Sequence, residues 1–194
     1  MNLVQIAPDR LLAGFRQLLL EKGVVTEEAM RHSTDVMAEA SPARGAAVVA
    51  RAWLDDAFRA RLLENGTRAV EEMGIFLPGA PPLGVLSNEE GLHHLIVCTL
   101  CSCYPRALLG YPPHWYKSAA FRARAVRDPR GLLREEWGTA IPDATKVRVV
   151  DSTADFRWMV LPRRPVGTEG WDEGRLAALL RESDLIGATV PHPG

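Results

Sequence analysis

The chain has 194 residues, of which 47% are hydrophobic and 24% charged, and its formal net charge at pH 7 is −1. This length suits one compact domain with an appended arm and is ample for a buried core. The balance of charge gives no electrostatic reason to expect binding to nucleic acid or to an anionic membrane, so neither is expected as a partner. No segment approaches the roughly 18 uninterrupted apolar residues of a membrane helix. With three cysteines and no export signal, a cytoplasmic location is expected.

The first part of the chain carries helical patterns. Residues 9–22 place leucines and Phe15 at helical spacing, and Gly23 follows as a stop signal. Capping residues and apolar spacing predict further helices from about residue 26 and over 41–54, 55–66 and 66–74. These helices are expected to form an N-terminal helical arm over residues 1–70.

The pattern changes after a loop rich in glycine and proline. Strands are predicted at 81–87, 93–99, 146–152, 156–162 and 185–190. Helices are predicted between them at 118–127, 129–137 and 172–183. The predicted fold class is therefore α+β, with the helical arm followed by a layered core of mixed strands and helices over residues 71–194 that carries a metal-binding turn.

All three cysteines lie in one short stretch, in a Cys-x-x-Cys-x-Cys pattern formed by Cys98, Cys101 and Cys103. An odd count of cysteines in a reducing compartment disfavours a disulfide. A structural zinc site needs four ligands, and His93 or His94 is the candidate for the fourth. An iron–sulfur cluster usually requires four cysteines. Thiols that merely pack in the interior are the remaining alternative.

The spacing of Cys101 and Cys103 around Ser102 favours a different site. In a tight turn the two sulfurs flank the intervening backbone amides, and deprotonated amide nitrogens would complete a square of two nitrogens and two sulfurs. Cys98 would then supply a sulfur on the axis, leaving one position open for substrate or water. Amide deprotonation requires a strongly Lewis-acidic ion, which favours a trivalent transition metal over zinc.

The stretch "VCTLCSC" resembles the metal-binding signature of nitrile hydratase alpha subunits. The likeness extends in the same order from about Val48 to Pro191. It includes "ARAWLDDAFRARLLENGT", "LGYPPHWYKSAAFRARAVRDPR", "KVRVVDS", "FRWMVLPRRPVGTEGW" and "SDLIGATVP".

The resemblance implies a set of metal ligands and their oxidation. The sulfurs of Cys98, Cys101 and Cys103 and the backbone nitrogens of Ser102 and Cys103 would hold the metal. Family members carry a sulfinic acid at the position of Cys101 and a sulfenic acid at that of Cys103, which makes these two the expected catalytic residues. Thr99 matches the cobalt-type members, so low-spin Co(III) is the expected ion, with Fe(III) as the alternative.

The implied reaction is the hydration of a nitrile to an amide. The implied partner is a beta subunit, or two smaller beta-like chains that replace it, and this partner donates two arginines to the oxidised sulfurs. In this chain Arg157 and Asp155 match positions near the subunit boundary. A solvent-facing ion pair between them is the alternative interpretation. A metal-carrying interaction subunit that is inactive without its partners is a further possibility for the whole chain.

The chain departs from the common family pattern directly after the last cysteine. Tyr104, Pro105 and Arg106 stand where typical members carry a Thr-Ala-Trp-Pro-like stretch that lines the substrate pocket. One interpretation is a larger, polar nitrile, as in the three-subunit enzymes that act on toyocamycin. A second is an anion held by Arg106, as in the related thiocyanate hydrolase gamma subunit, which shows a similar "CSCYPR" stretch. A third is a salt bridge from Arg106 to the partner. The resemblance as a whole favours nitrile hydratase.

Overall fold

The computed structural model describes residues 7–75 and 79–193. It divides the chain into two compact units, Met1–Glu39 and Ala40–Gly194. No helix among the described residues has both the length and the apolar character needed to cross a membrane.

The first unit consists of two helices, α1 (Pro8–Glu21) and α2 (Glu27–Glu39). Helix α1 contains no buried residue, and an exposed ion pair joins Arg16 to Glu27. The side chains of Leu11 and Phe15 on α1 are about half exposed. Helix α1 therefore depends on local helix formation and buries no side chain of its own.

Three helices that the sequence prediction assigned to the arm belong to the second unit. They are α3 (Pro42–Leu54), α4 (Asp56–Glu64) and α5 (Gly66–Glu72). Their apolar faces, including Val49 and Leu62, are fully buried in the same core as the strands. The boundary therefore lies between residues 39 and 40 and not at residue 70, because an amphipathic pattern indicates a buried face without indicating what covers it.

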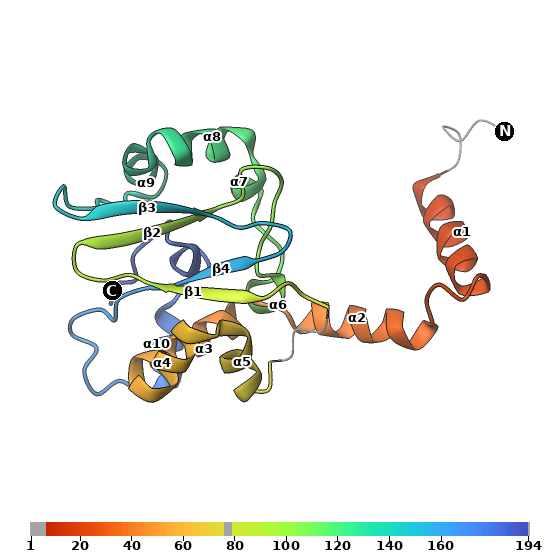
Figure 1. Cartoon of the computed structure of the whole chain (residues 1–194), viewed down its shortest axis with the longest axis horizontal. Helices are drawn as coiled ribbons and strands as arrows, with labels where there is room; N and C mark the ends of the chain where they lie inside the picture. The colour runs from red at the N-terminus through yellow and green to blue at the C-terminus, as the bar shows by residue number, and fades with distance from the viewer. Residues whose placement is uncertain (1–6, 76–78, 194) are drawn as a thin grey trace. The chain divides into compact units, whose positions relative to one another are not determined.

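The strands of the second unit form two separate parallel pairs (Figure 1). Strand β1 (Leu83–Ser87) pairs with β4 (Arg157–Leu161), and β2 (Leu92–Val97) pairs with β3 (Lys146–Asp151). Residues 95 to 97 of β2 and 159 to 161 of β4 are buried on both faces. Such continuous apolar runs are typical of parallel strands covered on both sides.

Helices cover the two strand pairs on opposite sides (Figure 1). Helices α8 and α9 contact β2 and β3, whereas α4 and α5 contact β1 and α10 packs on α3. The remaining elements, in chain order, are α6 (Arg106–Leu109), α7 (His114–Lys117), α8 (Ala119–Arg127), α9 (Pro129–Trp137), α10 (Glu173–Leu179) and the 3-10 helix η2 (Asp184–Ile186). The structure confirms the predicted mixed α and β fold class with N-terminal helices and a cysteine turn.

The strand predicted at 185–190 is wrong. The segment instead forms η2, followed by Gly187 at a φ of +79°. A Cβ at Gly187 would lie 1.8 Å from the carbonyl oxygen of His94, so only glycine allows this close approach to β2. The apolar run resembles a strand because η2 is buried on all sides, and periodicity alone does not separate the two for so short a segment.

Candidate metal centre

The cysteine turn begins at the carboxyl end of a parallel strand pair. Cys98 directly follows β2, whose last residue, Val97, pairs with Asp151 at the end of β3. The backbone N–H of Ser152 donates to the carbonyl of Val97 at 2.7 Å and continues the ladder by one step. The two chains therefore leave the sheet side by side, at the edge where α/β proteins commonly place their ligand sites.

Asp151 holds the first residues of the turn. One of its carboxylate oxygens accepts the backbone N–H of Thr99 at 3.0 Å, and the other accepts the Thr99 hydroxyl. Hydrogen bonds to a charged acceptor are stronger than those between neutral groups. This pair of bonds fixes the direction in which the chain leaves β2 toward Cys101.

Two further side chains hold backbone carbonyls of the turn. The hydroxyl of Tyr116, a fully buried residue, donates to the carbonyl of Cys103 at 2.9 Å. The guanidinium of Arg122 on α8 donates to the carbonyl of Cys101 at 3.1 Å. The turn is thus tied to α7 and α8 as well as to β3, and its conformation does not depend on the cysteines alone.

The three thiols converge on one point. Their sulfur atoms all lie within 4.8 Å of one another, with 3.5 Å between Cys98 and Cys101 and 3.3 Å between Cys101 and Cys103. All three cysteines are free, and only Cys101 is exposed. Three soft donors gathered without a disulfide suit a thiophilic transition metal ion, so the donor set fits the metal that the sequence predicts.

The thiols differ in acidity because their surroundings differ. Hydrogen bonds from Cys103 and then from Cys98 lower the pKa of Cys101 to about 7. Burial, followed by the contact with Cys101, raises the pKa of Cys103 to about 12, while the positive charge of Arg157 acts in the opposite direction. Cys101 therefore ionises more readily than Cys103. Metal binding requires thiolates and releases protons.

The structure places Tyr104 in the interior. Its hydroxyl donates to Glu182 at 2.5 Å, and its ring meets that of Tyr116 edge to face, with 5.0 Å between centroids. Burial raises the pKa of Tyr104, and the neighbouring Glu182 raises it further. Burial also raises the pKa of Glu182 itself. Tyr104 therefore stays protonated and donates its hydrogen bond to Glu182. Its role is structural, because it packs in the interior next to the cysteine turn.

Arg106 and Asp155 lie at the surface. Arg106 begins α6, and its guanidinium lies over the ring of Tyr111, 5.3 Å from the centroid. Asp155 is exposed in the turn before β4, where its backbone N–H donates to the Thr153 hydroxyl at 3.3 Å. Across the described ranges the ion pairs include none between Asp155 and Arg157. The alternative of an ion pair on this strand thus finds no support.

Sequence reasoning missed two residues that shape the turn, Asp151 and Arg122. Asp151 had a signal, because it is a polar residue directly after a predicted apolar strand, where side chains of adjacent parallel strands meet. Arg122 had none, because its contact with Cys101 joins residues 21 apart in sequence and depends on how α8 packs.

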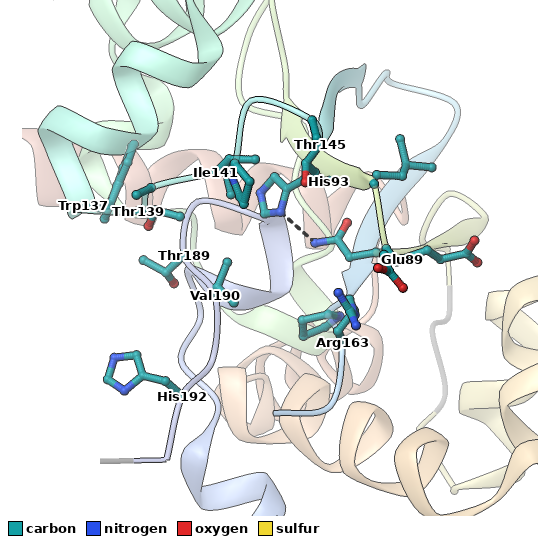
Figure 2. A pocket seen from close by; sticks show the side chains of 18 of the residues that line it. Glu89, His93, Trp137, Thr139, Ile141, Thr145, Arg163, Thr189, Val190 and His192 are labelled. Carbon is teal, nitrogen blue, oxygen red and sulfur yellow. Dashed lines mark hydrogen bonds between the residues drawn. The ribbon is translucent and has the colours of Figure 1, made fainter. Parts of the chain in front are cut away.

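A large pocket lies at the other end of β2. Its volume is about 700 Å³, and its lining includes Glu89, His93 and Arg163 (Figure 2). The two ring nitrogens of His93 form hydrogen bonds, one with the side-chain amide of Asn88 at 3.1 Å and one with the carbonyl of Gly187 at 2.8 Å. Both ring nitrogens are thus engaged away from the cysteines. Among the described residues the candidate metal group contains the three cysteines and no histidine, so a zinc site completed by His93 or His94 is not supported.

Comparison with known proteins matches most of the chain. The family described as nitrile hydratase, alpha chain, matches residues 7–189. The low-molecular-weight cobalt-containing nitrile hydratase subunit alpha of Rhodococcus rhodochrous is 47% identical over 175 residues, which cover 90% of this chain and 84% of that protein. The thiocyanate hydrolase subunit gamma of Thiobacillus thioparus is 40% identical over 190 residues, covering 92% and 78%.

Solved structures give the same picture. A recombinant thiocyanate hydrolase with partially modified cobalt centres superposes with a TM-score of 0.88 at 38% identity, covering 98% of this chain and 93% of that one. A double mutant of the Fe-type nitrile hydratase from Comamonas testosteroni Ni1 superposes with a TM-score of 0.83 at 40% identity, covering 95% and 90%.

Proposed function

Since the chain belongs to the nitrile hydratase alpha chain family, we propose that it is the metal-binding catalytic subunit of an enzyme that hydrates a nitrile to the corresponding amide. The observation that carries this proposal is the convergence of Cys98, Cys101 and Cys103 on one point within a turn of six residues. Water adds across the carbon–nitrogen triple bond, its oxygen going to carbon and its protons to nitrogen.

We propose cobalt as the resident ion, held by the three sulfurs and by the backbone nitrogens of Ser102 and Cys103. Relatives named as cobalt-containing support this choice, as does Thr99 at the position that marks the cobalt type. A trivalent ion supplies Lewis acidity that polarises a bound nitrile or acidifies a bound water. Iron is the alternative, because an Fe-type enzyme is among the similar structures.

The chain's own residues keep the turn in one conformation. Asp151 orients Thr99, and Tyr116 fixes the carbonyl of Cys103. Such preorganisation removes reorganisation from the reaction itself. Cys101 faces outward whereas Cys103 is buried. We assign the catalytic roles to these two cysteines and expect them to be oxidised, to sulfinic acid at Cys101 and to sulfenic acid at Cys103.

We propose that the chain works in a hetero-oligomer in the cytoplasm. The partner is a beta subunit or two smaller beta-like chains, as the name alpha chain of the matching family suggests. Leu100, in the middle of the cysteine turn, is 90% exposed, which fits a surface that another chain covers. The three free thiols fit a reducing compartment. An alpha subunit that only carries the metal until its partner binds remains the alternative.

Hydrolysis of thiocyanate is the second candidate function. Arg106 supports it, because an exposed guanidinium three residues after Cys103 offers a positive charge to an anionic substrate. Similarity to a thiocyanate hydrolase gamma subunit supports it as well. If the substrate is instead a nitrile, Arg106 favours a larger, polar nitrile such as toyocamycin.

Activity measurements on the cobalt-loaded complex test the proposal. The full chain, copurified with its partner chains, is expected to contain one cobalt per chain and to convert nitriles to amides. Mass spectrometry of the peptide from Cys98 to Cys103 should show added oxygen on two sulfurs. Release of carbonyl sulfide and ammonia from thiocyanate, with nitriles left unchanged, would establish the second candidate. Zinc on three unmodified thiols would contradict both.

A further inference from the structure

A guanidinium on α8 contacts the peptide group that joins Cys101 to Ser102. The Nη1 nitrogen of Arg122 donates to the carbonyl oxygen of Cys101 at 3.1 Å. The carbon of that carbonyl is bonded to the backbone nitrogen of Ser102, which is one of the two nitrogens in the proposed ligand set. The contact therefore joins a permanent positive charge to a peptide group that takes part in holding the metal.

No acid of this chain neutralises Arg122 within the described residues. The ion pairs found in residues 7–75 and 79–193 include none with Arg122. Arg124, two residues further along the same helix, instead pairs with Asp128 and with two acids of α9. The charge of Arg122 thus faces a neutral carbonyl, although a guanidinium binds an anionic acceptor about twice as strongly as a neutral one.

Metal binding would turn this carbonyl oxygen into an anionic acceptor. A peptide group shares electrons among its oxygen, carbon and nitrogen, which gives the carbon–nitrogen bond its partial double-bond character. When the nitrogen of Ser102 gives up its proton to become a ligand, the negative charge is therefore shared with the carbonyl oxygen of Cys101. That oxygen already lies at hydrogen-bond distance from Arg122, so the charged pair forms without any movement of the chain.

The contact from Tyr116 to the same turn provides a contrast. Its hydroxyl donates to the carbonyl oxygen of Cys103 at 2.9 Å. That carbonyl belongs to the peptide group between Cys103 and Tyr104, whose nitrogen is not in the proposed ligand set. Both side chains hold the turn, but only Arg122 contacts a peptide group that contains a ligand nitrogen.

We propose that Arg122 is a positioning residue for the metal centre, whose guanidinium is the counter-charge to the Cys101–Ser102 peptide group when the nitrogen of Ser102 binds the metal. This inference rests on the proposed function. Arginine suits the role because its guanidinium stays charged and presents its donors in a fixed plane. Removing an outer partner of a metal ligand usually costs about 10–100-fold in metal affinity.

Four variants separate the charge of Arg122 from its structural contribution. Arg122→Gln is neutral, and Arg122→Lys keeps the charge. Arg127→Gln is the charge-matched control, because Arg127 is exposed at the end of the same helix. Tyr116→Phe removes the other hydrogen bond to a carbonyl of the turn.

Each full-length variant is produced with its partner chains in cobalt medium. The visible absorption bands of the cobalt centre and the cobalt–nitrogen distance from X-ray absorption report on the ligand nitrogens. The rate of cobalt loss to a chelator reports on metal affinity, and the melting temperature reports on the fold.

We expect Arg122→Gln to shift the cobalt bands and to lose cobalt about 10-fold faster than wild type. Arg122→Lys should recover most of both properties, and Arg127→Gln should match wild type. Tyr116→Phe should lower the melting temperature without moving the bands, because it leaves the Cys101–Ser102 peptide group in contact with its cation.

Unchanged bands and cobalt retention in Arg122→Gln would overturn the inference. So would equal losses in Arg122→Gln, Arg122→Lys and Tyr116→Phe that follow only their melting temperatures, because such losses would assign Arg122 a purely structural role. If Arg122→Gln fails to fold, Arg122→Met replaces it as the neutral variant. A wild-type complex with cobalt bound through sulfur alone would refute the inference but not the proposed function, whereas one that holds no cobalt would refute both.

Discussion

The two ends of strand β2 differ in kind: a pocket lies at one end, and a cluster of reactive thiols lies at the other. At its amino end lies the pocket of about 700 Å³, where the buried polar side chains are bonded within the chain: His93 to Gly187 and Thr139 to the carbonyl of Ala188 at 3.0 Å. At its carboxyl end three thiols crowd together, and the buried Nη1 nitrogen of Arg157 has no hydrogen-bond partner in the described part of the chain.

The comparison shows that clustered thiols and an unpaired buried donor identify the functional site better than the size of a pocket does. Within the described part of the chain, the buried side-chain polar atoms of this pocket have hydrogen-bond partners. In the turn, the sulfur of Cys101 lies 3.5 Å from that of Cys98 and 3.3 Å from that of Cys103. They stay there because Asp151, Tyr116 and Arg122 hold the backbone, and such constraint is characteristic of functional sites.

Removal of one thiol from the turn should have the largest effect on metal binding and activity. Cys98→Ala is expected to abolish cobalt binding and to lower nitrile hydration by more than about 1,000-fold, because removing a direct metal ligand disables the metal's chemistry. Elemental analysis and amide production measure both effects. Glu89→Gln at the pocket rim is the matched control and should keep one cobalt per chain. A cobalt-replete and active Cys98→Ala protein would remove the turn from the mechanism.

A smaller effect is expected from the acid that orients the turn. Asp151→Asn keeps the shape but loses the charge and one of the two acceptors that bind Thr99. Cobalt affinity should fall about 10–100-fold, as for other outer partners of metal ligands. Competition with a chelator measures this change. Asp143→Asn, in an exposed loop, is the control, and an equal loss in both variants would show that only net charge matters.

The free energy of unfolding should depend on pH because of His93, which lines the pocket at the amino end of β2. Burial lowers the pKa of His93 from its ordinary value of 6.5, so the unfolded chain binds a proton more tightly than the folded chain does. The stability contribution is complete above about pH 6.5 and is lost as the pH falls from there through the lowered pKa of the folded state. Denaturant unfolding at several pH values measures this loss.

A variant at the same position isolates the histidine. His93→Leu should weaken the pH dependence below about pH 6.5 and cost about 1–3 kcal/mol of stability at neutral pH, because the carbonyl of Gly187 loses its partner. Cobalt retention at neutral pH should not change. A variant that keeps the wild-type pH dependence would assign the effect to other groups.

Sequence reasoning reached the site more fully than the fold. The cysteine spacing is local, so the three ligands could be predicted from Cys98 to Cys103 alone. The boundary of the arm could not, because whether Val49 faces a core or solvent depends on strands that lie far away in sequence. The segment after Asp184 was misread because burial on all sides hides the difference between a short strand and a 3-10 turn. The contact of Arg122 with the turn depends on tertiary packing.

The smallest structural effect is expected at Arg106, where the change in specificity is the informative measurement. Arg106→Trp removes a cation that lies over the exposed ring of Tyr111, a contact worth about 0.5–1 kcal/mol at such a site. Stability and cobalt content should therefore stay near wild type. If Arg106 attracts an anion, the ratio of kcat/KM for thiocyanate to that for a neutral nitrile should fall about tenfold.

An unchanged ratio would place Arg106 outside substrate selection. In that case the charge serves the contact with the partner subunit, which a salt-dependent change in subunit affinity would reveal, since surface ion pairs weaken as ionic strength rises.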